Sequence, residues 1–135
     1  MALSFNFRKE SSKTFGYIYR PWAKVLIWSE RYESWETIWM IVDTGADYTL
    51  LPFYLAEQFG IGVNKLKSLE TRGIGGSGKV YLYKKLKVRL GNWERLIPAG
   101  FLENSNVPPL MGRQMFIETF ETHFSRKHVI SFDEK

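Results

Sequence analysis

The feature that most constrains the fold is a long alternation of apolar and polar residues from Lys79 to Leu90. Successive side chains of a β-strand point to opposite faces, so this spacing predicts a strand with one buried face. The apolar face is predicted to carry Val80, Leu82, Leu86, Val88 and Leu90, interrupted by Lys84. The opposite face is predicted to carry Tyr81, Tyr83, Lys85, Lys87 and Arg89. Gly91-Asn92 then predicts a hairpin turn into a second strand over Trp93–Leu102.

Shorter apolar runs predict the other strands. Thr37–Val42 is apolar on both faces, as in a fully buried strand, and ends at Asp43. The run Lys24–Trp28 is predicted to pair with it as a hairpin. Further strands are predicted at Tyr48–Leu51, Leu110–Gly112, Glu121–Phe124 and Val129–Phe132.

Two short helices complete the prediction. Pro52 and Gly60 bracket a helix over Phe53–Phe59, because proline suits a helix start and glycine a helix end. A second short helix is predicted over Arg113–Thr119. The sum is an all-β domain of the barrel type with one or two short helices.

Composition predicts a single domain over residues 1–135. The chain is 44% hydrophobic and 16% aromatic, enough apolar area to offset the conformational entropy of ordering a chain of this size. We expect residues 1–14 to be a loosely ordered N-terminal segment.

Composition also excludes several classes of protein. The absence of cysteine excludes a disulfide scaffold, a cysteine-ligated metal and a thiol nucleophile. A net charge of +5 allows a polyanionic partner without requiring one. Charged residues from Arg8 onward interrupt the N-terminal apolar stretch, and no apolar run reaches the roughly 18 residues that cross a bilayer. We expect a soluble, cytoplasmic protein with no membrane partner.

The candidate for chemistry is the segment Asp43-Thr44-Gly45-Ala46-Asp47, directly after the buried strand. A carboxylate at the end of an apolar strand is costly unless it is hydrogen-bonded, and Gly45 and Ala46 leave it open to an approaching molecule. The alternative is a turn aspartate that bonds only its own loop. The surrounding sequence decides between them.

Two later segments accompany this loop in a fixed order. They are the glycine-rich stretch Gly73–Gly78 and the segment Leu110-Met111-Gly112-Arg113 before a predicted helix. Together, over about residues 35–132, the three segments resemble the retropepsin-like aspartic proteases. The first resembles the catalytic loop of that family, the second its flap and the third its other signature segment. The resemblance implies an acid-protease barrel that acts as an aspartic endopeptidase on peptides or proteins.

The resemblance also implies a homodimer. Hydrolysis by this route needs two carboxylates that share a proton, and the chain has a single Asp-Thr-Gly. A twofold axis would bring the Asp43 side chains of two subunits together. One carboxylate would take a proton from the attacking water, and the other would hydrogen-bond the developing oxyanion.

Individual roles follow from the same resemblance. Asp43, Thr44 and Gly45 would be catalytic, with Thr44 bonding across the dimer and the Gly45 carbonyl binding substrate backbone. Ile74 would lie at the flap tip, and Asp47 would pair with Arg113. The resemblance implies substrate binding by Ala46, Asp47, Tyr48, Gly73, Ile74 and Gly75, and structural support from Gly112 and Arg113. Tyr48 stands where some retroviral enzymes have a second acid, which alters the expected substrate pocket.

Other readings are less favoured. Gly73–Lys79 matches nucleotide-binding patterns, but those require a following helix, and Val80–Leu90 reads as a strand. Basic residues between Lys65 and Arg95, with the two tyrosines of the alternating strand, would suit single-stranded nucleic acid, but exposed strand faces are commonly lysine-rich. No nucleic-acid partner is expected.

Histidine spacing gives no metal site, because His123 and His128 lack partners at a ligand spacing, and no cofactor is predicted. The alternative function is a dimer of the same fold that binds peptide or protein without cutting it.

Overall fold

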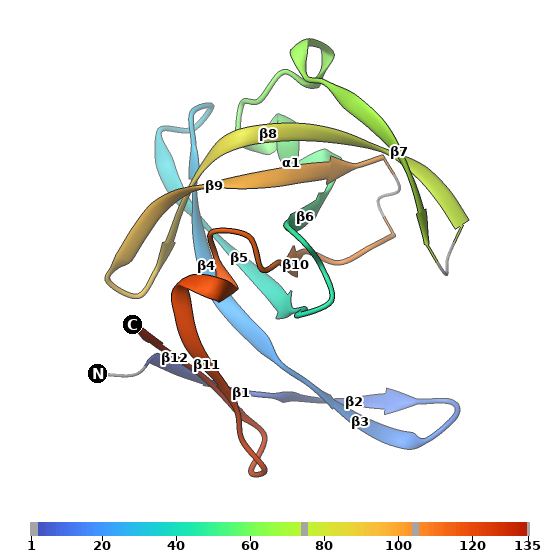
Figure 1. The fold of residues 1–135 in the computed structure, drawn as a ribbon, viewed down its shortest axis with the longest axis vertical. Helices are drawn as coiled ribbons and strands as arrows, with labels where there is room; N and C mark the ends of the chain where they lie inside the picture. Colours follow the sequence, from blue (N-terminus) through green and yellow to red (C-terminus); the bar gives the residue numbers. More distant parts are fainter. Residues whose placement is uncertain (1–2, 74–75, 104–105, 135) are drawn as a thin grey trace.

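The computed structural model describes residues 3–73, 76–103 and 106–134. The strands, short helices (α) and 3₁₀ turns (η) are shown in Figure 1. In chain order they are β1 Leu3–Asn6, β2 Arg8–Ser12, β3 Gly16–Arg20, β4 Trp22–Ser29, β5 Ser34–Val42, β6 Thr49–Pro52, α1 Tyr54–Gln58, η1 Val63–Lys65, β7 Ser68–Gly73, β8 Gly76–Leu90, β9 Trp93–Leu102, β10 Leu110–Met111, η2 Ile117–Thr119, β11 Phe120–Phe124 and β12 Val129–Glu134.

The body of the molecule is a closed β-barrel. A seven-stranded sheet has the order β4-β5-β10-β6-β9-β8-β7, and β4 pairs again with β8 to close it. The closing pairs are Leu26 with Arg89 and Ile27 with Val88. Beyond these pairs, β8 continues into a hairpin with β7 that extends away from the barrel (Figure 1). The all-β barrel predicted from the sequence is confirmed.

Alternating apolar residues fill the barrel. On β4 the fully buried apolar side chains are Ala23, Val25 and Ile27, and β5 adds the buried side chains of Met40 and Val42. The largest fully buried side chains are Phe59, Phe101 and Phe116, which come from three different parts of the chain. The predicted hairpin of residues 24–28 with 37–42 is confirmed by the antiparallel pairing of β4 with β5.

The predicted apolar face of the long strand is confirmed for its second half, whereas in its first half Val80 is buried as predicted but outside the main core cluster. Leu86, Val88 and Leu90 are buried as expected. The register of β8 against β9 shifts between Tyr83 and Leu86, and before that shift Tyr81 and Tyr83 pack against the core. A bulge of this kind reverses which alternate side chains face inward. Tyr81 and Tyr83 therefore lie on the opposite face of β8 from Lys87 and Arg89.

The expectation of a loosely ordered segment at residues 1–14 is wrong for residues 3–12. β1 pairs with β12 in a three-stranded sheet of order β1-β12-β11, and β2 pairs with β3. Pairing between the two ends of the chain depends on contacts far apart in sequence, which local periodicity does not report.

The helical predictions are confirmed in part. Helix α1 lies within the predicted range 53–59. The second helix is reduced to the 3₁₀ turn η2, because Met115 adopts a φ of 58° and Phe116 a φ of −121°, neither of which continues a helix.

Candidate functional site

Asp43 lies where two parallel strands end. Leu110 and Met111 of β10 pair with Ile41 and Val42 of β5, and the Asp43 amide donates to the Met111 carbonyl at 3.0 Å. The buried strand therefore delivers the carboxylate to one edge of the barrel, at the start of a turn.

The turn itself orients the carboxylate. The Gly45 amide donates to Asp43 Oδ1 at 2.9 Å, and the Ala46 amide donates to the Asp43 carbonyl at 3.2 Å. Asp43 is half-buried, whereas Thr44 and Gly45 are exposed on the single chain. A Cβ at Gly45 would lie 3.3 Å from Asp43 Oδ1, so a larger residue would crowd the same oxygen. The loop presents one carboxylate in a fixed orientation.

Asp47 and Arg113 form the ion pair that the sequence predicts. Arg113 Nη2 donates to Asp47 Oδ1. The backbones are joined as well, because the Arg113 amide donates to the Ala46 carbonyl at 2.9 Å and the Gln114 amide to the Asp47 carbonyl at 2.8 Å. The segment after β10 is thus attached to the loop after β5 by backbone and side-chain bonds.

Gly112 permits this attachment. A Cβ at Gly112 would lie 2.2 Å from the Tyr48 carbonyl carbon and 2.6 Å from the Thr49 amide nitrogen. The Gly112 amide donates to the Oγ1 of Thr49, which is fully buried, at 3.2 Å. Sequence analysis missed Thr49, because nothing local distinguishes it from any other strand threonine. At Gly112, therefore, a side chain cannot be added without moving the neighbouring backbone.

Tyr48 lies beside the same loop in a small packed group. A Cβ at Gly100 would lie 2.5 Å from Val80 Cγ1 and 2.8 Å from Tyr48 Cε2, so both side chains cover this glycine. Burial, and then the negative charge of Asp47, raises the pKa of the Tyr48 phenol above its ordinary value of 10.0. Tyr48 therefore places an uncharged aromatic ring next to the Asp43 loop.

The glycine-rich segment belongs to the β7–β8 hairpin. Gly73 ends β7 opposite Gly76 of β8, and Ile74 and Gly75 lie outside the described residues. The following segment is strand rather than helix, so the nucleotide-binding patterns lack the helix that they require.

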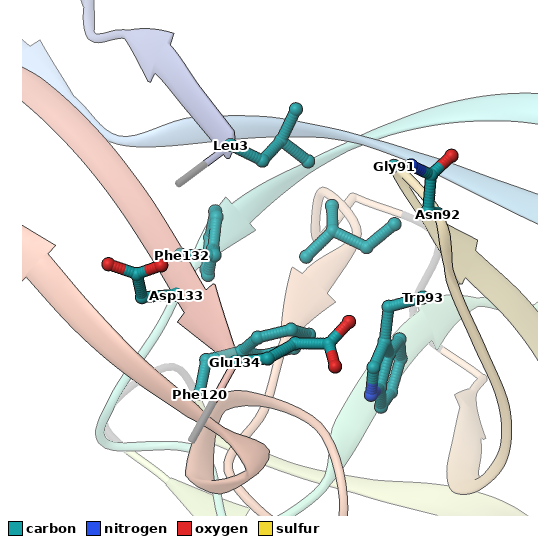
Figure 2. Close-up of a pocket in the computed structure, with 9 residues that line it drawn as sticks. Leu3, Gly91, Asn92, Trp93, Phe120, Phe132, Asp133 and Glu134 are labelled. Carbon is teal, nitrogen blue, oxygen red and sulfur yellow. The ribbon is translucent and has the colours of Figure 1, made fainter. Parts of the chain in front are cut away.

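One cavity is lined by residues of β1, β8, β9, β11 and β12. It has a volume of about 570 Å³ and contains none of the predicted site residues in its lining. Figure 2 shows apolar side chains around it, with the carboxylates of Asp133 and Glu134 at its edge. This cavity is therefore separate from the Asp43 loop.

The described residues lack two further features. Within them, no group of three or more histidines, aspartates or glutamates lies close enough to hold a metal ion. No helix in this part of the chain has the length and apolar character needed to cross a membrane.

Known proteins resemble this chain in sequence and in fold. The family model described as gag-polyprotein putative aspartyl protease matches residues 35–118, which include both the Asp43 loop and Arg113. The crystal structure of a retropepsin-like aspartic protease from Rickettsia conorii matches with a TM-score of 0.66 and 18% sequence identity, over 98% of this chain and 91% of that one. At that identity the likeness shows the fold. No curated protein matches in sequence.

Proposed function

Since this chain belongs to the retropepsin-like aspartic protease family, we propose that it is a homodimeric aspartic endopeptidase whose dyad is Asp43 from each subunit. The observation that carries the proposal is the Asp43 loop, which presents one oriented carboxylate at the edge of the barrel. Peptide hydrolysis without a metal or a nucleophilic side chain needs two such carboxylates. A second subunit supplies the other across a twofold axis.

The two Asp43 side chains have different roles in the proposed reaction. One Asp43 accepts a proton from a water molecule as the water oxygen bonds to the peptide carbonyl carbon. The partner's Asp43 is protonated and hydrogen-bonds the carbonyl oxygen as negative charge develops there. The carbon–nitrogen bond then breaks, and a proton passes to the leaving nitrogen. The two carboxyl groups share one proton in this mechanism, because two like charges side by side repel each other.

The surrounding residues hold the loop and bind substrate. Thr44 is exposed on the single chain, in keeping with a bond to the partner subunit. Asp47, oriented by Arg113, binds the substrate main chain, and Tyr48 lines a pocket for a substrate side chain. The β7–β8 hairpin acts as a flap that closes over the peptide and excludes bulk water. The substrate is a peptide or protein, and the cytoplasm remains the predicted compartment.

The test is cleavage of a broad peptide library from acidic to neutral pH, with and without pepstatin. Asp43→Asn should abolish cleavage while leaving the fold and the dimer intact. Asp133→Asn, an exposed aspartate on β12, is the matched control and should cleave normally. Unchanged cleavage by Asp43→Asn would remove this residue from the mechanism. A confirmed wild-type dimer that cleaves nothing would favour the alternative, a dimer that binds peptides without cutting them.

A further inference from the structure

The hairpin of β2 and β3 stands apart from the rest of the molecule. Residues 8–20, here called the arm, form a two-stranded sheet of their own that projects from the barrel (Figure 1). A lone two-stranded hairpin is marginally stable in water and gains stability from packing against another surface. Packing against a partner surface would therefore stabilise the arm.

The tip of the arm exposes large aromatic side chains. Phe15 is 79% exposed and Tyr17 is 64% exposed, although the Lys9 ammonium lies 4.2 Å from the Tyr17 ring. Aromatic rings of this size contribute strongly to protein interfaces, because they bury much apolar area at little cost in side-chain entropy. Two exposed aromatic rings, two residues apart near the end of a projecting hairpin, provide a small docking surface.

The base of the arm, in contrast, is firmly attached. The Arg8 guanidinium lies between the rings of Trp22 and Trp39, at 4.6 and 4.7 Å from their centroids. The Trp22 indole donates to Glu10 at 2.7 Å. The Tyr19 ring stacks on His128 at 3.9 Å. These contacts fix the direction of the arm, so its tip is presented ready for binding.

The base of the arm also lies next to the strand that leads into Asp43. The Val42 amide donates to the Pro21 carbonyl at 2.8 Å, and Trp22 pairs with Ile41. The arm thus begins beside the residue that precedes Asp43. A twofold axis between two Asp43 carboxylates places the second subunit next to this point. The five residues of β3 span about 17 Å from there at about 3.4 Å per residue, enough to lie along a neighbouring subunit.

We propose that the arm is a dimerisation clasp, whose tip residues Phe15 and Tyr17 pack on the second copy of this chain. The inference rests on the proposed function, because only the shared Asp43 dyad brings that copy to the base of the arm. The interface is isologous, so each subunit clasps the other. The arm thereby helps to hold the two halves of the site together.

The first test measures the dissociation constant of the dimer by sedimentation. The double variant Phe15→Ser/Tyr17→Ser should raise it by at least about tenfold. Tyr32→Ser/Tyr54→Ser is the matched control, because it removes two exposed tyrosines outside the arm and should leave the constant unchanged. A wild-type dimer whose affinity is equal in the arm variant would overturn the clasp and leave the proposed function standing. A wild type that is monomeric at every concentration would overturn both.

A second test locates the tip directly. The chain has no cysteine, so Lys13→Cys can carry a single photo-crosslinker on the arm, and Asn64→Cys on η1 is the control. Labelled chains are mixed with isotopically heavy wild-type chains before irradiation. The clasp predicts crosslinks from the arm to heavy peptides and none from the control. Crosslinks confined to the arm's own chain, in a confirmed dimer, would refute it. Neither test uses cleavage, so an inactive clasped dimer would refute the proposed function alone.

Discussion

Replacing Gly112 by alanine should destabilise the protein and disturb the site together. The added Cβ would lie 2.2 Å from the Tyr48 carbonyl carbon and 2.3 Å from its oxygen. Both are backbone atoms, so the β10–β6 junction must open for the methyl group to fit. Overpacking of this kind costs about 1–3 kcal/mol. Weakening the buried bond from Gly112 to Thr49 adds about 1–3 kcal/mol, because a buried donor loses its partner.

The combined loss, about 2–6 kcal/mol, is large beside a total stability of roughly 5–15 kcal/mol. It should lower the thermal midpoint by roughly 10–20 °C in a chain of this size. Urea denaturation of the variant beside the wild type measures the free energy directly. Cleavage should fall as well, because Arg113 and its pairing with Asp47 follow Gly112 immediately.

Gly62→Ala is the matched control. A Cβ at Gly62 meets nothing within 4 Å, and its φ of −82° suits any residue. The change should be neutral or stabilise by about 0.5 kcal/mol. Thr49→Val separates the hydrogen-bond contribution from the overpacking contribution, because it removes the acceptor at nearly constant volume. It should cost about 1–3 kcal/mol. Equal stability of Gly112→Ala and Gly62→Ala would refute the close-packing argument.

Two further predictions concern charges near the loop. Arg113→Ala should change the free energy of unfolding by less than about 1 kcal/mol, because both partners of the ion pair are largely solvated. It should nevertheless lower kcat/KM about tenfold to a hundredfold, because Asp47 is no longer held in place. Urea denaturation and peptide cleavage measure the two effects, and a loss confined to stability would contradict the positioning role. The raised pKa of Tyr48 means that above pH 10.0 the unfolded chain loses this proton first, so stability is full below that pH and falls as pH rises through the folded value. Tyr48→Phe should therefore lose less stability than the wild type between neutral and strongly alkaline pH, and parallel losses in urea denaturation would contradict the assignment.

Local pattern was enough to predict the parts of the fold that depend on neighbours in sequence. Short apolar runs predicted β4 and β5, and the alternation of apolar residues predicted the second half of β8. Pro52 and Gly60, which suit a helix start and a helix end, predicted α1. The Asp43 loop could be recognised because its residue types and their order are local. The segment at Gly112 could be recognised for the same reason.

Tertiary structure decided what depends on contacts between distant segments. Leu3 pairs with Phe132, and no periodicity within residues 1–14 reveals a partner at the other end of the chain. The register shift in β8 turned Tyr81 inward because packing against β9, rather than the alternation itself, selects the buried face. Gly112 lies against Tyr48 and Thr49 only because β10 is inserted between β5 and β6. The sequence alone thus predicted which residues would carry the proposed chemistry. Long-range pairing determined how those residues are held, because pairing energies depend on neighbours that a local pattern cannot identify.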